Sequence, residues 1–180
     1  MIDMSTFDGS RVSLRLIEKR DGPRLGSILS DLREQQSTAY NQHASYFGSK
    51  RMLEQILNSD VEHFIHFGIR IKNVEGIIGL MSFQHWSRVQ SKATVAYMLD
   101  RTYWNQGIAT EALRILLEFG FRELGLHQVE GRCQEDNMAS EKVMTNNGLT
   151  WVRTIPRRDG TQMPVHAVKV FSLSQFLLHK

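Results

Sequence analysis

The 180-residue chain has the length of one domain, and its 41% hydrophobic and 23% charged residues are typical of a soluble globular protein. Its net charge of +3 comes without a dense Lys/Arg run, so charge alone does not indicate nucleic-acid binding. Cys133 is the only cysteine, which excludes an intramolecular disulfide and a cysteine-based metal cluster. The apolar runs are too short to cross a bilayer and the N-terminus lacks the pattern of a secretory signal, so we expect a cytoplasmic protein.

The first half of the chain combines strands and helices. Residues 12–16 alternate apolar and polar side chains, as a strand does, and a stretch that opens at Asp21 has the helical period. Residues 35–48 are polar and aromatic without a clear period, and 50–58 form a second predicted helix. From residue 63 the period becomes two, which predicts strands at 63–71, 77–86 and 92–99.

The second half contains the strongest predicted helix, residues 109–124, which Gly125 ends. A strand at 128–133, a helix at 137–146, a strand at 150–155 and a last strand within 162–173 follow. Antiparallel hairpins that give way to strand–helix–strand units predict one α/β domain over residues 1–180. Its mixed, mostly antiparallel sheet has about seven strands and helices on both faces.

A candidate anion site lies where the strand at 92–99 leads into the long helix. The first amides of a helix have no intrahelical acceptor and carry a partial positive charge, so they attract phosphate. Gly107 lets the backbone approach an anion because it has no Cβ. Amides from Gln106, Gly107, Ile108, Ala109 and Thr110 can therefore hold a pyrophosphate. A glycine two residues before an alanine is common by chance at a helix start. The pattern supports an anion site here because it directly follows a predicted strand.

A second cluster lies at residues 137–149. Asn137 is a good N-cap for the predicted helix, and Ser140 falls in the first turn, where a serine is commonly just solvated. Neither residue indicates a function by itself.

The two clusters in this order resemble the GNAT superfamily of N-acetyltransferases, most closely its RimJ/RimL ribosomal-protein branch. That branch has a tyrosine near a strand end, a Trp-x-x-Gly-x-Ala-x-Glu-Ala helix start, and a later Asn-x-x-Ser followed by a short helix. The matching residues are Tyr97, Trp104, Gly107, Ala109, Glu111, Ala112, Asn137, Ser140 and Gly148-Leu149. The resemblance spans residues 76–153, and the strand at 12–16 is also similar.

The resemblance implies a fold and a co-substrate. In the family the strand matching 92–99 splays from the strand matching 128–133, and the pantetheine arm of acetyl-CoA lies in the cleft between them. The arm pairs with backbone at Met98 and Leu99, the pyrophosphate lies on the amides 106–110, and Asn137 contacts the arm. We therefore expect acetyl-CoA as co-substrate, no metal, and a monomer or homodimer.

The implied reaction is direct attack of a neutral amine on the thioester. Positioning of two bound reactants contributes much of the acceleration, and a backbone amide near Met98 stabilises the developing oxyanion. In the resembled branch a serine has been proposed to protonate the leaving thiolate, and it corresponds to Ser140. Because a free thiol has a pKa of about 8.5, the thiolate is a fair leaving group even without this acid.

The chain departs from the family at the general base, because Thr94 stands where relatives often carry a glutamate. A threonine cannot take a proton at neutral pH. An α-amino group, with a pKa of about 8, is partly neutral at pH 7, whereas a lysine amine at about 10.4 is far less so. This favours a protein or peptide N-terminal α-amine as acceptor. His85 and Asp100 are candidate bases acting through water, although both also suit structural or solvated roles.

Several residues are not assigned to the site. His63 and His66, three apart on a predicted strand, face opposite sides and make a poor metal pair. Cys133 fits a buried core position, and Trp86 and Trp151 fit packing positions.

The sequence does not decide between several classes of amine acceptor, or between an enzyme and a binding module. Tyr40, Tyr46 and Phe47 lie where the family often shapes its acceptor pocket, but the family's tryptophan-rich stretch is missing there, which weakens a ribosomal-protein acceptor. A small amine such as an amino sugar, an antibiotic or a polyamine is nearly as well supported. A non-catalytic acyl-CoA-binding module is a further hypothesis, and a basic surface that docks on RNA has little support.

Overall fold

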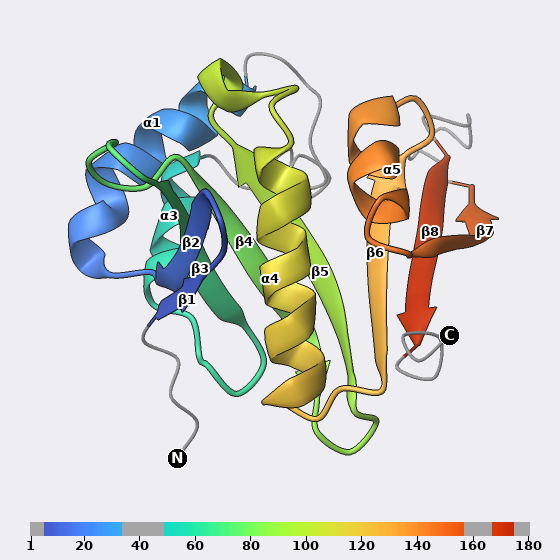
Figure 1. Cartoon of the computed structure of the whole chain (residues 1–180). Coiled ribbons are helices and arrows are strands. Elements are labelled where there is room, and N and C mark those ends of the chain that lie inside the picture. The colour runs from blue at the N-terminus through green and yellow to red at the C-terminus, as the bar shows by residue number, and fades with distance from the viewer. Residues whose placement is uncertain (1–5, 34–48, 157–166, 175–180) are drawn as a thin grey trace.

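The computed structural model describes residues 6–33, 49–156 and 167–174, and an eight-stranded sheet forms its centre (Figure 1). The strands are β1 (Thr6–Asp8), β2 (Val12–Leu16), β3 (Ile65–Ile71), β4 (Gly79–Ser87), β5 (Lys92–Leu99), β6 (Gln128–Gln134), β7 (Thr150–Ile155) and β8 (Val168–Ser174). They lie in the order β1-β2-β3-β4-β5-β6-β8-β7, and within the described residues only β5 and β6 run parallel. The predicted mixed, mostly antiparallel sheet is confirmed, with one strand more than expected.

The additional strand is β1, which with three residues is too short to show an alternating pattern. Tertiary packing holds it in place. The ring of Phe7 lies 4.4 Å from that of Phe119 and 5.7 Å from that of Phe67, measured between centroids. These aromatic contacts connect β1 to a helix and a strand far along the chain, and no local sequence signal reports them.

The central strands β5 and β6 separate along their length. Residues 92–95 of β5 pair with 128–131 of β6, and no rung joins the two strands beyond this point. β6 continues to pair with β8 as far as Gln134, so residues 96–99 of β5 have an unpaired edge toward β6. Figure 1 shows the two strands diverging toward the start of α4. The predicted splayed strand pair is thereby confirmed.

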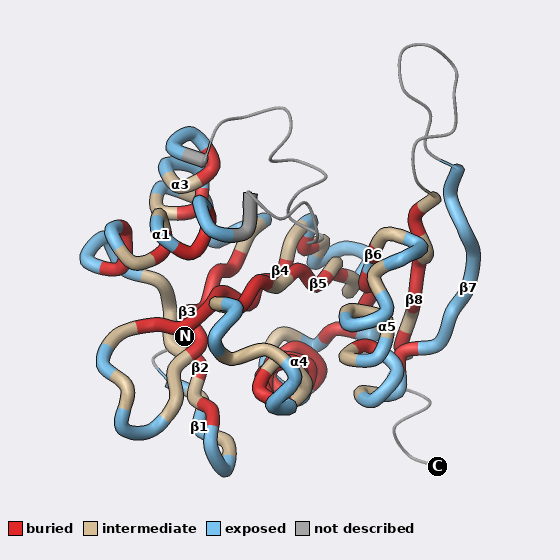
Figure 2. The backbone as a smooth tube through the Cα atoms, turned by 90° about the horizontal axis from the view of Figure 1, so that it is seen from above, coloured by how far each residue is buried: buried red, intermediate tan, exposed pale blue. Residues whose placement is uncertain are grey.

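Helices cover both faces of the sheet, as predicted (Figure 2). α1 (Gly22–Arg33) and α3 (Ser49–Leu57) lie on one face, and α4 (Ile108–Arg122) and α5 (Met138–Thr145) on the other. Each face has its own hydrophobic cluster, the larger one under α4 and the smaller one under α1 and α3. The side chains of β5 alternate between them: Val95 belongs to the first cluster, and Ala96 and Met98 to the second.

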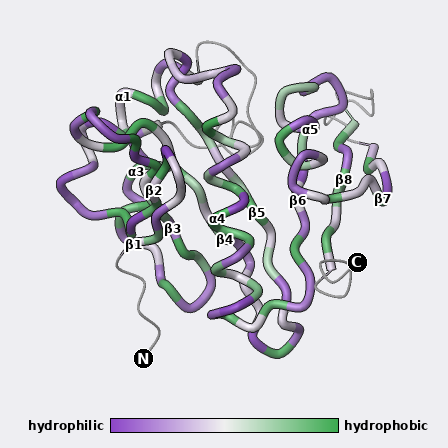
Figure 3. Tube along the Cα trace, in the orientation of Figure 1, coloured by the Kyte–Doolittle hydropathy of each residue, from purple (hydrophilic) through white to green (hydrophobic). Residues whose placement is uncertain are grey.

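α4 packs closely on the sheet. Hydrophobic and hydrophilic residues alternate along it (Figure 3), and Ala112, Leu113 and Leu116 are buried. A Cβ at Gly120 would lie 2.5 Å from the Phe83 ring, so only glycine allows this approach. The long helix is thereby fixed against β4.

Most predicted elements have nearly the predicted bounds, and the strands at 12–16, 92–99 and 150–155 have the same ones. Cys133 and Trp86 are buried, as predicted. The prediction for Trp151 is wrong: it is 59% exposed because β7 is an edge strand with all its residues exposed.

No helix among the described residues is long and apolar enough to cross a bilayer. Tyr40, Tyr46 and Phe47 lie outside the described residues.

Candidate active site

A cavity of about 470 Å³ lies between the end of β5 and the first turns of α4 and α5. Of the nine predicted site residues, the structure brings eight to its wall: Met98, Leu99, Gly107, Ile108, Ala109, Thr110, Asn137 and Ser140. The ninth, Gln106, is not among the lining residues, and its side chain donates to the Thr102 carbonyl (2.8 Å). Two segments about thirty residues apart in the sequence thus meet around one cavity.

The start of α4 has the geometry of an anion site. Gly107 is the N-cap and has a φ of 75°, a left-handed conformation that glycine adopts without strain. The first bond of the helix runs from the Glu111 amide to the Gly107 carbonyl (3.0 Å). The amides of Ile108, Ala109 and Thr110 therefore have no acceptor within the helix, and these residues line the cavity.

The β1–β2 hairpin brings a cation to this helix start. Arg11 donates from Nη1 to the Gln106 carbonyl (3.2 Å) and from Nε to the buried Glu111 carboxylate (3.2 Å). Glu111 also accepts from Ser10 Oγ and from the amides of Arg11 and Val12. Burial disfavours the charged form of Glu111, but these hydrogen bonds outweigh it and lower its pKa to about 2. The ionised carboxylate thus fastens the hairpin to α4.

The unpaired edge of β5 presents backbone groups to the cavity. The Ser91 carbonyl accepts from the amide of His127, the residue before β6 (2.7 Å). Successive residues of a strand direct their backbone N–H and C=O groups to opposite edges, so every second residue from Ser91 onward directs these groups toward β6. By this alternation Tyr97 and Leu99 face the unpaired edge. Met98 faces β4 instead, because its carbonyl oxygen lies 2.5 Å from the Cβ position at Gly79. The amides closest to the predicted position at Met98 are therefore those of its two neighbours.

One carbonyl on this edge is already engaged. Trp104 Nε1 donates to the Leu99 carbonyl (2.8 Å). The Trp104 indole thus connects the end of β5 to the loop before α4. The Leu99 amide and the amide and carbonyl of Tyr97 are directed at the gap between β5 and β6.

Ser140 is held from two sides. Its amide donates to Asn137 Oδ1 (3.0 Å), which confirms Asn137 as the N-cap of α5, and its carbonyl accepts from Tyr97 Oη (3.1 Å). Burial raises the pKa of Tyr97 above its usual value, so the phenol stays protonated and donates. Tyr97 comes from β5 and Ser140 from α5, the helix that follows β6, so this hydrogen bond connects the two sides of the β5–β6 separation.

The position of the missing glutamate and the two candidate bases have different surroundings. Thr94 lies on β5 opposite Glu130 of β6. Asp100 accepts a hydrogen bond from the Thr102 amide and pairs with Arg24. Burial disfavours its charged form, but these contacts outweigh burial and lower the pKa of Asp100. His85 is exposed at an irregular part of β4. Neither Asp100 nor His85 lines the cavity.

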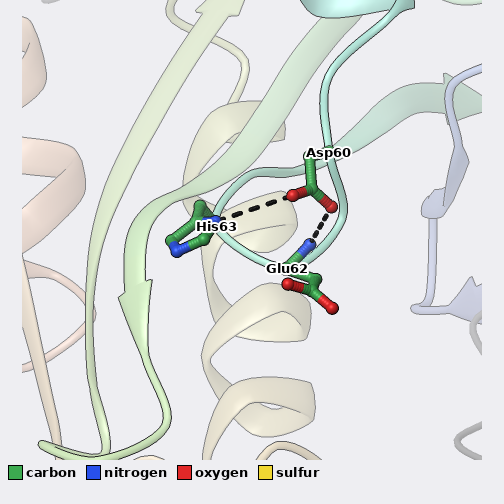
Figure 4. Close-up of side chains that lie close together, drawn as sticks. All are labelled: Asp60, Glu62 and His63. Atoms are coloured by element: carbon green, nitrogen blue, oxygen red, sulfur yellow. Dashed lines mark hydrogen bonds and ion pairs between the residues drawn. The ribbon is translucent and has the colours of Figure 1, made fainter.

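Three side chains with metal-ligating atoms lie together in the turn before β3 (Figure 4). The ligand atoms of Asp60, Glu62 and His63 are within 4.8 Å of one another, and all three residues are exposed. Asp60 accepts from the Glu62 amide (2.8 Å) and lies 3.7 Å from His63 Nδ1, contacts that stabilise the turn itself. His66 is apart from this group: it is buried, and its Nδ1 lies 2.6 Å from Ser82 Oγ.

Some cavity residues were missed by the sequence analysis. Lys142 and Val143 of α5 and Asn146, its C-cap, line the cavity together with Asn137 and Ser140. Their spacing of three and four residues places them on one helical face, a signal that could have identified them. No comparable signal exists for Arg11, which is about a hundred positions from Glu111.

Comparisons with known proteins agree with this geometry. Residues 11–150 match the family described as acetyltransferase (GNAT) domain. The N-acetyltransferase p20 of Bacillus licheniformis is 25% identical over 172 residues, which is 95% of this chain and 96% of the relative. The ribosomal-protein-serine acetyltransferase of Escherichia coli is 31% identical over 73 residues, 41% of each chain. The solved structure of the RimL ribosomal-protein alpha-N-acetyltransferase in complex with coenzyme A has a TM-score of 0.76 at 20% identity, covering 92% of this chain and 95% of that one.

Proposed function

The chain belongs to the GNAT family of acetyltransferases, and from this premise we propose that it transfers the acetyl group of acetyl-CoA to a primary amine, with a protein or peptide N-terminal α-amine as the acceptor. The cavity at the unpaired edge of β5 carries this proposal, because it joins an anion-binding helix start to free strand amides. Acetyl-CoA has matching parts: a diphosphate, an extended arm that can pair with a strand, and a thioester at the end of the arm.

In the proposed complex the diphosphate lies on the amides of Ile108, Ala109 and Thr110, with the Arg11 guanidinium beside them. The pantetheine arm pairs along the edge of β5 as an added strand would. Tyr97 and Leu99 supply the backbone groups, since those of Met98 are directed at β4.

Acetyl-CoA supplies an activated carbonyl, and the amine forms the new C–N bond while the C–S bond breaks. An amide of Tyr97 or Leu99 donates to the developing oxyanion. Ser140 donates its hydroxyl proton to the departing sulfur, which leaves as the CoA thiol. The amine nitrogen loses one proton as the C–N bond forms, and this proton returns through water to the Ser140 oxygen. The contacts of Asn137 and Tyr97 hold the Ser140 backbone in place beside the cavity.

The acceptor assignment rests on Thr94. With no carboxylate at that position, an amine that is partly neutral at physiological pH is favoured, and α-amines meet this condition better than lysine. The E. coli relative, which is named a ribosomal-protein-serine acetyltransferase, supports a protein as the acceptor. A threonine at this position is also compatible with the alternative of a non-catalytic acyl-CoA-binding module.

Two measurements test the proposal. Calorimetric titration with acetyl-CoA should show binding at one site. Release of free thiol, followed with a panel of peptides and small amines, should then accelerate with unblocked peptides and not with N-terminally blocked ones. Binding without acceleration by any amine would contradict acetyl transfer and favour the binding module.

A further inference from the structure

Three cationic side chains surround one carboxylate on the sheet face opposite α5. Glu130 Oε1 lies 2.8 Å from Lys92 Nζ and 3.9 Å from an Arg153 nitrogen, and its other oxygen lies 3.6 Å from Arg132 Nη2. The Glu130 side chain is only 6% exposed, whereas those of Lys92, Arg132 and Arg153 are 33%, 47% and 48% exposed. We call these three cationic residues the basic face.

The basic face lies where β5 and β6 separate. Glu130 is opposite Thr94, one rung before the pairing ends, and Arg132 is one residue past the last rung. Val129 and Cys133 belong to the cluster under α4 and α5, so Glu130 and Arg132 point to the other face. Within the described residues no helix covers this part of that face, since α1 and α3 pack on β4 and on Ala96 and Met98 of β5, beyond the rung that pairs Thr94 with Glu130 (Figure 2).

The charges of this group do not cancel. Burial disfavours the charged form of Glu130, but Lys92, Arg153 and Arg132 outweigh it and lower its pKa, so the carboxylate is ionised at neutral pH. One negative charge therefore faces three positive ones. Each guanidinium has five N–H donors, and its exposed part keeps donors for a further carboxylate.

We propose that the acceptor carries carboxylates next to its amine, and that Lys92, Arg132 and Arg153 bind them while the amine enters the separation between β5 and β6. This inference rests on the proposed acetyl transfer and defines its substrate as an N-terminal segment rich in acidic side chains. Polyamines and amino sugars are cationic, so the same charges repel them. The basic face thus distinguishes two acceptor classes that the sequence leaves open.

Three peptides of equal length test the proposal on the full chain. They share an N-terminal serine, and their second to fourth residues are acidic, neutral or basic. We expect kcat/KM for the acidic peptide to exceed that for the neutral one about tenfold at low salt, the size expected of two partly exposed ion pairs, and to fall as salt is added. The basic peptide and spermidine should be poorer than the neutral peptide.

Two substitutions locate the effect. The double variant Arg132→Gln and Arg153→Gln should lose most of the preference for the acidic peptide and keep its KM for acetyl-CoA. Lys92 stays, because its 2.8 Å contact keeps the buried Glu130 paired. Arg122→Gln is the matched control: Arg122 is an exposed arginine at the end of α4 that pairs with Glu118, and its loss should change neither value.

The outcomes separate this inference from the proposed function. Equal kcat/KM for the three peptides would overturn the basic face as an acceptor site while leaving acetyl transfer intact. The same holds if the double variant keeps the full preference with a native circular-dichroism spectrum. Failure of every peptide in the presence of bound acetyl-CoA would instead contradict the acetyl transfer itself.

Discussion

The two sides of the β5–β6 separation are built in different ways. On the side of α4 and α5 the cavity wall includes the amides at the start of α4, and all its lining residues lie within one continuous stretch of chain, residues 97–146. On the opposite side the charged residues come from three strands, β5, β6 and β7, and meet only through the sheet register. Backbone amides do not depend on the side chain, so the first side suits a ligand whose structure does not vary. On the second side, single substitutions can change the charge without altering the backbone.

The largest effect should come from the backbone side. Gly107→Glu places a Cβ at a positive φ and a negative charge at the phosphate position, so we expect acetyl-CoA affinity to fall at least about a hundredfold while the fold survives. Calorimetry measures the affinity. Gly76→Glu is the matched control, because Gly76 has a φ of 79° with no atom near its Cβ position and is not in the cavity wall. Unchanged affinity in the Gly107 variant would refute the anion site.

The contact between the hairpin and α4 should be next in size. Glu111→Gln weakens a buried acceptor of four hydrogen bonds, so we expect the free energy of unfolding to fall by about 2–3 kcal/mol. Denaturant unfolding measures this value, and Glu118→Gln, at an exposed position on the same helix, should change it little.

The same variant gives a pH test. Because the pKa of Glu111 falls from 4.5 to about 2 on folding, its contribution is complete above pH 4.5 and is lost as the pH falls toward 2. The unfolding free energy of the variant should therefore depend less on pH in this window. A slope equal to that of the unchanged protein would show that Glu111 is not responsible.

A smaller effect is expected at the proposed acid. Ser140→Ala should lower kcat about tenfold near pH 7, and the deficit should shrink above the thiol pKa of about 8.5, where the thiolate leaves unprotonated. Steady-state rates across pH measure this dependence. Equal turnover at every pH would remove Ser140 from the mechanism.

The smallest effect concerns the bridge across the separation. Tyr97→Phe removes the donor to the Ser140 carbonyl, a hydrogen bond that contributes about 1 kcal/mol. We expect a decrease in kcat of a few-fold with little change in acetyl-CoA affinity. Tyr103→Phe, in the wall of the same cavity, serves as control. Equal kinetic effects of the two substitutions would show that the contact with Ser140 does not position it.

The parts of the molecule that local patterns encode were predictable. The bounds of β2, β5 and β7 follow from alternation, and the cavity wall follows from helix starts at Gly107 and Asn137. The contacts that depend on register were not. The pairing of Thr94 with Glu130 and the contact of Arg11 with Glu111 join distant positions through tertiary structure, and no local period reports either.

The parallel pairing of β5 and β6 determines which parts of the molecule form one continuous unit. Parallel neighbours require a crossover, and here α4 provides it, so the strand edge, the amide row and the second helix are all specified between residues 92 and 146. α1, α3 and the β7 edge stand outside that unit. Arg153 of the basic face lies outside the unit, whereas Lys92 and Arg132 lie within it on the face opposite the cavity. Side chains on that face and the outer elements can therefore change without altering the amide row or the strand edge.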